Sequence, residues 1–152
     1  MTATIRRLKA GESYPWSLLL LADPHREIVE SYVSKGSCYV LQQEQEVIGV
    51  FVLLPTRPLT VELVNIAVAE AYQGKGYGKK LVLEAVRMAR ESGYKTIEVG
   101  TGNSSIPQLA LYQKCGFRII GVDLNFFQLH YPEPIMENGM VCRDMIRLQQ
   151  HL

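Results

Sequence analysis

The residues best suited to bind a charged ligand lie together at positions 73–80, in the run Gln-Gly-Lys-Gly-Tyr-Gly-Lys-Lys. Three glycines at alternate positions let the backbone adopt positive φ angles and approach a ligand closely. The apolar segment 63–68 before them indicates a strand, and the amphipathic segment 81–90 after them indicates a helix. The first N–H groups of a helix have no partner within it, and with the helix dipole they favour an anion. This stretch therefore predicts a phosphate-binding site.

The spacing of the glycines excludes two common phosphate motifs. A Walker A loop starting at Gly74 would need glycine at position 79, and so would a dinucleotide fingerprint built on Gly74 and Gly76, but position 79 is lysine. The pattern present is Gln-x-x-Gly-x-Gly, from Gln73 to Gly78. It resembles the pyrophosphate-binding motif of the GNAT superfamily of acyl-CoA-dependent N-acetyltransferases, which lies between the fourth strand and the following helix. A solvent-exposed Gly-Lys turn is the alternative interpretation.

This resemblance implies that acetyl-CoA is the cosubstrate and that no metal is required, and it implies how acetyl-CoA would be bound. The loop would hold the pyrophosphate, and the backbone at the end of the preceding strand would pair with the pantetheine arm. In the family this strand is splayed from its neighbour, so that its amides reach the thioester oxygen. Asn103 resembles a cofactor-contacting asparagine, although its longer interval to Tyr112 leaves a turn or cap role open. The implied cofactor-binding residues are Ile66, Ala67, Val68, Gln73, Gly74, Lys75, Gly76, Tyr77, Gly78, Lys79 and Asn103.

Acetyl transfer to an amine requires deprotonation of the ammonium, polarisation of the thioester and a proton for the departing thiolate. The run from Ala110 to Phe117 resembles a family signature whose tyrosine, here Tyr112, is commonly the general acid, and a phenol pKa of about 10 suits that task. Glu62 stands where several members hold a catalytic glutamate. The alternative for Tyr112 is a tyrosine that only packs in the core, and the alternative for Glu62 is a solvated residue at the start of a strand. Strand alternation predicts Asn65 on the face opposite Glu62.

No activated Cys, Ser or Lys nucleophile is evident, which favours direct attack in a ternary complex. The acceptor is expected to be a primary amine of a small molecule or peptide. Aromatic and acidic side chains favour a cationic amine, and a loop packed on the sheet is the alternative interpretation. These candidate side chains are Trp16, Asp123, Phe126, Phe127, His130, Tyr131 and Glu133. Two other functions stay open, a non-catalytic acyl-CoA-binding regulatory module and a nucleotide-phosphate enzyme.

The hydrophobic and turn patterns predict the elements that position these residues. Four helices are expected: one that begins near Pro15 with Ser13 as its cap, one from Asp23 to Gly36, one over 77–91 and one from Ser105 to Gly116. Pro55 and Pro58 are expected to end the third strand. The order matches the GNAT fold, an α/β fold with a mixed, mostly antiparallel sheet of about seven strands and about four helices. One domain over 1–152 is expected. The predicted strands are 2–9, 38–42, 47–54, 61–68, 96–99, 117–129 and 141–148.

The composition limits which binding partners and which cellular compartment are expected. A net charge of +1 gives no support to a nucleic-acid surface. Three widely spaced cysteines indicate reduced thiols in a cytoplasmic protein, and three isolated histidines give no metal-ligand spacing. The aliphatic run 18–22 is too short to cross a membrane, and no signal-peptide core is present. The family resemblance alone suggests a homodimer formed through the C-terminal strands.

Overall fold

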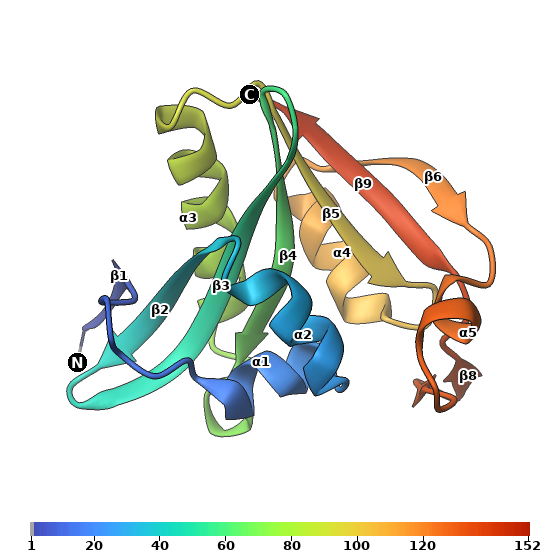
Figure 1. The fold of residues 1–152 in the computed structure, drawn as a ribbon, viewed down its shortest axis with the longest axis horizontal. Helices are drawn as coiled ribbons and strands as arrows, with labels where there is room; N and C mark the ends of the chain where they lie inside the picture. The colour runs from blue at the N-terminus through green and yellow to red at the C-terminus, as the bar shows by residue number, and fades with distance from the viewer. Residues whose placement is uncertain (1) are drawn as a thin grey trace.

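A computed structural model describes residues 2–152; Met1, the first residue of the predicted domain, lies outside the described part. The main strands are β1 (Ala3–Arg7), β2 (Ser37–Gln43), β3 (Glu46–Arg57), β4 (Thr60–Val68), β5 (Thr96–Gly102), β6 (Arg118–Asp123) and β9 (Met145–His151). They form one sheet in the order β1-β2-β3-β4-β5-β9-β6 (Figure 1). Neighbouring strands are antiparallel except β4 and β5, which are parallel. The predicted GNAT-type sheet is therefore confirmed.

Helices cover both faces of this sheet. On one face lie α3 (Tyr77–Glu91) and α4 (Ile106–Lys114), and on the other lie α1 (Trp16–Ala22) and α2 (Arg26–Val33). A single 3-10 turn, η1 (Glu70–Tyr72), precedes α3, while α5 (Phe126–His130) and a small hairpin of β7 (Met136–Glu137) and β8 (Met140–Val141) precede β9. Within residues 2–152, none of these helices is long and apolar enough to cross a membrane.

The apolar periodicity of α3 explains why this helix is docked. Its buried side chains repeat at helical spacing and pack against the middle of the sheet. Gly76 and Gly93, both at positive φ, lie on either side of the helix, where a left-handed residue turns the chain. The predicted bounds of this helix are confirmed. Its buried residues are Leu81, Val82, Ala85, Val86 and Ala89.

Strands β4 and β5 separate after a short paired region. Pairing extends from Thr60↔Thr96 to Leu63↔Val99, and beyond Leu63 no residue of β4 pairs with β5. At this point β4 also contains an extra residue, Val64, because Asn65 opposes Val52 while Leu63 opposes Leu53. A β-bulge bends a strand and increases its twist. The two strands therefore diverge toward their C-terminal ends, as Figure 1 shows.

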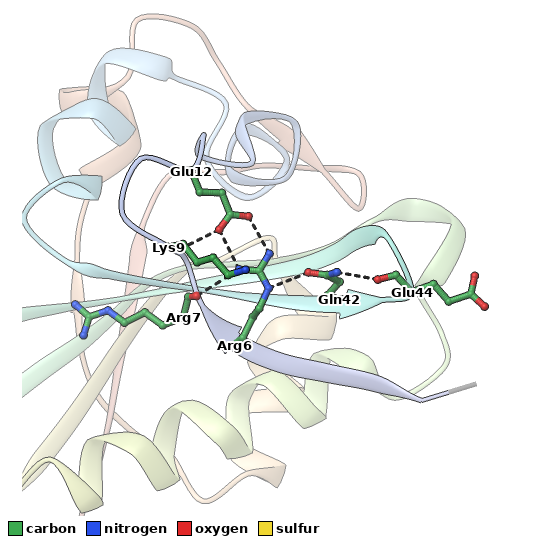
Figure 2. Close-up of polar contacts among 6 residues, drawn as sticks. All are labelled: Arg6, Arg7, Lys9, Glu12, Gln42 and Glu44. Carbon is green, nitrogen blue, oxygen red and sulfur yellow. Dashed lines mark hydrogen bonds and ion pairs between the residues drawn. The ribbon is translucent and has the colours of Figure 1, made fainter.

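A polar cluster anchors the edge strand β1 to the segment that leads into α1 (Figure 2). The Arg6 guanidinium donates to both carboxylate oxygens of Glu12, at 2.9 and 2.8 Å, and to Gln42 Oε1 of β2 at 2.8 Å. Glu12 also accepts from the backbone N–H of Lys9 at 2.9 Å. The hydrogen bond from Arg6, followed by that from the Lys9 backbone, lowers the pKa of Glu12 to about 2. This cluster fixes the path of the chain from β1 toward α1.

Four sequence predictions are wrong in detail. The segment 117–129 is not one strand, because Asn125 at φ +62° turns the chain into α5. Pro55 does not end β3, which continues to Arg57. Pairing with β2 stops at Leu53, so Pro55 lies where β3 borders only β4. No side chain caps α1, whose N-cap residue is Pro15 rather than Ser13. The last strand begins at Met145 rather than Val141, because β8 forms a separate hairpin.

Candidate active site

Two cavities meet where β4 and β5 diverge. The first, called here the loop cavity, has a volume of about 450 Å³ and extends from the glycine loop to α4. The second, called the inner cavity, has a volume of about 360 Å³ and lies between β4, β5 and the segment around α5 and β7. Both cavities are lined by the same five residues at their junction: Leu21, Ala22, Ile66, Gln108 and Tyr112.

The loop cavity brings together most of the residues expected to bind the cofactor. Seven of the eleven line it, namely Ile66, Ala67, Val68, Gln73, Gly74, Tyr77 and Gly78. Four do not: Lys75, Gly76, Lys79 and Asn103. Lys75 lies over the Tyr72 ring, with Nζ 5.4 Å from its centroid, while Gly76 and Lys79 border a depression on the outer side of α3.

The geometry of the glycine loop fits a pyrophosphate. Gly74 and Gly76 have φ angles of +78° and +87°, and no atom lies within 4 Å of the position a Cβ would take at either. The backbone is therefore open to a ligand. No side chain caps the N-terminus of α3, so its first N–H groups face outward from the helix end. Gln73 Nε2 donates to the carbonyl of Val68 at 2.9 Å and holds the loop against the end of β4.

Tyr112 lies on α4 at the junction of the two cavities. Its side chain is 3% exposed and packs edge-on against the Phe117 ring, with the two ring centroids 6.0 Å apart. Among residues 2–152 its hydroxyl has no hydrogen-bond partner. Burial raises the pKa of this phenol, and the nearby Cys115 thiol raises it further, so the hydroxyl keeps its proton at neutral pH. Tyr112 is thus a protonated phenol that lines both cavities.

Glu62 lies on β4 two residues before the bulge and lines neither cavity. Its neighbours in the sheet are Leu54 and Glu98. Burial raises the pKa of the Glu62 carboxyl; the charge of Glu98 acts in the same direction, whereas Arg147 and Arg57 oppose it. A raised pKa makes this carboxylate a better proton acceptor near neutral pH.

The prediction that Asn65 lies on the face opposite Glu62 is wrong. Asn65 bonds to Leu19 of α1 and Tyr32 of α2, and Val64 packs on the same helical layer. Leu63 packs on the α3 side instead. Because the bulge places two consecutive residues on one face, Glu62 and Asn65 both face α1 and α2.

Asn103 is held in the turn between β5 and α4. Its Oδ1 accepts from the backbone N–H groups of Arg143 and Asp144 at 2.7 and 3.0 Å, and its Nδ2 donates to the carbonyl of Val141 at 3.2 Å. The side chain thereby fastens the segment before β9 to the end of β5.

The inner cavity contains only part of the expected acceptor-binding set. Phe127 and Tyr131 line it. Trp16, Asp123, Phe126, His130 and Glu133 do not; Trp16 lies beneath the Arg26 guanidinium, and Asp123 pairs with Arg147 at 2.7 Å. Sequence reasoning missed Asp23 and Glu137. Asp23 lies at the start of the helix predicted from Asp23 to Gly36, and Glu137 precedes an Asn-Gly pair. These local patterns do not indicate that the two residues line one cavity.

Within residues 2–152, His, Cys, Asp and Glu side chains form no group of three that could hold a metal ion. All three cysteines are free and buried.

Comparisons with known proteins agree with this geometry. A family model described as the acetyltransferase (GNAT) family matches residues 4–117. The chain is 59% identical over 145 residues to the uncharacterized N-acetyltransferase YvbK of Bacillus subtilis (strain 168), which covers 93% of this chain and 94% of that protein.

Two solved structures are similar over nearly the whole chain. An IAA acetyltransferase from Bacillus cereus ATCC 14579 has a TM-score of 0.96 and 56% identity, covering 99% of this chain and 100% of that chain. A GNAT family acetyltransferase from Elizabethkingia anophelis, with acetyl-CoA bound, has a TM-score of 0.96 and 47% identity, covering 99% of this chain and 98% of that chain. These similarities do not favour a non-catalytic binding module. The chain therefore belongs to the acetyltransferase (GNAT) family and is an acyl-CoA-dependent N-acetyltransferase.

Proposed function

We propose that the protein transfers the acetyl group of acetyl-CoA to a primary amine by direct attack, with the donor in the loop cavity and the acceptor in the inner cavity. The observation that carries this assignment is the position of Tyr112, which lines both cavities and has a hydroxyl without a partner in the described chain. A ternary complex suits two cavities that open into each other, since both substrates then lie beside one proton donor.

The donor side is supported by the loop and the free edge of β4. The N-terminus of α3 and the glycine backbone suit the pyrophosphate. Beyond Leu63 the edge of β4 is not paired with β5, and Ile66, Ala67 and Val68 line the loop cavity there. An extended pantetheine arm can pair with such an edge in the way a peptide adds a strand. The similar Elizabethkingia anophelis protein was solved with acetyl-CoA bound, which supports acetyl-CoA as the donor.

The proton transfers are assigned to two side chains. Tyr112 donates its proton to the thiolate that leaves when the amine nitrogen bonds to the acetyl carbon. Glu62 accepts the proton that the ammonium must lose. Because Glu62 lines neither cavity, this transfer requires an intervening water.

We further propose one functional unit, a cytoplasmic location and a homodimer. A single sheet contains strands from both ends of the chain, which supports one unit. The free, buried thiols suit a reducing compartment. The edge strand β6 exposes Ile119, Ile120 and Val122, which suit burial against a second copy.

The test is steady-state kinetics of Tyr112→Phe. Loss of the proton donor should lower kcat by roughly 10²-fold or more while the KM for acetyl-CoA changes little. Tyr94→Phe is the matched control, because Tyr94 packs against the same core and lines neither cavity. A kcat for Tyr112→Phe within about twofold of the control would contradict the role of Tyr112.

A further inference from the structure

The inner cavity is lined by carboxyl groups and by no basic side chain. Its lining includes two carboxylates, Asp23 and Glu137, and no lysine, arginine or histidine. Within the described chain, neither carboxylate forms an ion pair. Charges removed from water are costly unless a partner of opposite sign compensates them. A cationic ligand would supply that partner.

Asp23 is fixed in place by neutral donors. It follows α1, and its Oδ1 accepts from the Tyr131 hydroxyl at 2.9 Å while its Oδ2 accepts from the Tyr32 hydroxyl at 3.3 Å. Burial raises the pKa of this carboxyl, opposed by the hydrogen bonds from Tyr131, the His25 backbone and Tyr32 and by the nearby His25 ring. These hydroxyls orient the carboxylate but leave lone pairs free, since a carboxylate has about four acceptor sites.

Asn65 adds an unpaired acceptor to the same cavity. Its side chain is 3% exposed and lines the inner cavity, and its buried Oδ1 has no partner. The amide orientation is fixed, because Nδ2 donates to the Leu19 carbonyl at 3.1 Å and an oxygen there could not. Nδ2 also donates to the Tyr32 hydroxyl at 3.0 Å, which in turn donates to Asp23. The network therefore ends in two acceptors, the Asp23 carboxylate and the unpartnered Asn65 Oδ1, on residues that line the inner cavity.

Glu137 lines the same cavity from β7. It accepts from the hydroxyls of Ser105 and Ser104, at 2.9 and 3.2 Å. The cavity thus offers oxygen acceptors from α1, β4 and β7, and a carboxylate-bearing molecule inside it would meet two like charges.

We propose that Asp23, with the amide oxygen of Asn65 in the same cavity, binds the ammonium group of the acceptor, and that the accepted amines carry no carboxylate. This inference rests on the proposed acetyl transfer. Asp23 lines the inner cavity and directly follows Ala22, a residue that lines both cavities. The substrate class is therefore a small primary amine, with a second cationic group favoured by Glu137.

The first experiment compares acceptors that share one carbon chain. Initial rates with acetyl-CoA are measured for 1,4-diaminobutane, ornithinamide and ornithine. We expect kcat/KM for the first two to exceed that for ornithine by roughly 10-fold or more, since only ornithine brings a carboxylate. Equal or faster acetylation of ornithine would overturn the proposed acceptor class.

The second experiment removes the charge of Asp23. Asp23→Asn should raise KM for 1,4-diaminobutane by roughly 10- to 100-fold, with a smaller change in kcat, and should reduce the preference for ornithinamide over ornithine. Asp123→Asn is the control, because Asp123 pairs with Arg147 and lines neither cavity. A purely structural effect would lower activity and leave that preference unchanged, and this result would overturn the role of Asp23.

The two levels of the assignment fail differently. If acetyl-CoA binds and neither carboxylate-free amine is acetylated, this acceptor class is wrong and the donor site stands. If acetyl-CoA does not bind, the proposed function itself is wrong. Calorimetric titration of the wild-type chain with acetyl-CoA separates these outcomes.

Discussion

Glu62 shows how one residue can oppose stability and serve chemistry. It lies directly across from Glu98 in the parallel pair β4–β5, on the sheet face that carries α1 and α2. The raised pKa of Glu62, caused first by burial and then by Glu98, means that its ionised form is less stable in the folded chain than in water. Folding is therefore favoured by a protonated Glu62 and disfavoured by its charge.

Glu62→Gln should accordingly change stability and activity in opposite directions. Because the folded pKa exceeds the unfolded one, the stabilisation from the proton is present at low pH and is lost as the pH rises through the folded pKa. At neutral pH the variant should unfold at a higher temperature than wild type, and the difference should vanish below about pH 4. If Glu62 accepts the ammonium proton, kcat/KM should fall by roughly 10²-fold.

Thermal unfolding from pH 4 to 8 and initial rates over the same range provide the measurements. Glu98→Gln is the control, since it removes the neighbouring carboxylate and its ion pair with Arg57. An unchanged rate in Glu62→Gln would show that Glu62 is a strand residue without a role in proton transfer.

Among the elements, the turn between β5 and α4 depends on Asn103. Asn103→Ala removes three hydrogen bonds and leaves two backbone N–H groups and one carbonyl without their partners. We expect a loss of about 1–3 kcal/mol in the free energy of unfolding, measured by urea denaturation. The affinity for acetyl-CoA should change by less than about threefold. A weakening of acetyl-CoA binding far beyond that, with little loss of stability, would restore the cofactor contact that the sequence resemblance implied.

The sequence predicted the elements better than their mutual placement. The α3 bounds followed from apolar periodicity and flanking glycines. The bulge at Val64 left no signal in an apolar run, and it reversed the predicted face of Asn65. Helix α5 had a signal, because Phe126 and His130, like Phe127 and Tyr131, are aromatic pairs four residues apart. The β-branched residues before this helix, Ile119, Ile120 and Val122, nevertheless favoured a strand.

The residues of the candidate site also fall into two groups, those that lie in local motifs and those that are far apart in the sequence. The glycine loop and Tyr112 carry local motifs, so they could be named as candidates from the sequence alone. Asp23 and Glu137 are separated by more than one hundred positions and meet only in the inner cavity. Such a pairing depends on how α1 and β7 pack around the diverging strands, which no local pattern records.

On the scale of the whole molecule, the opening between β4 and β5 should be where acetyl-CoA enters. Gly78 lines the loop cavity on the first turn of α3, and a Cβ there would lie 3.5 Å from Leu111 Cδ2, an ordinary contact. Gly78→Ala should therefore be tolerated and should stabilise α3 by about 0.5–1 kcal/mol. Gly78→Leu should extend into the loop cavity instead.

The most direct measurement is thermal unfolding of wild type, Gly78→Ala and Gly78→Leu with and without acetyl-CoA. At a ligand concentration of about 100 times Kd, wild type should gain roughly 2.7 kcal/mol of stability. Gly78→Ala should respond in the same way, and Gly78→Leu should fold but show little or no shift. An equal shift in all three proteins would contradict acetyl-CoA binding between the glycine loop and α4.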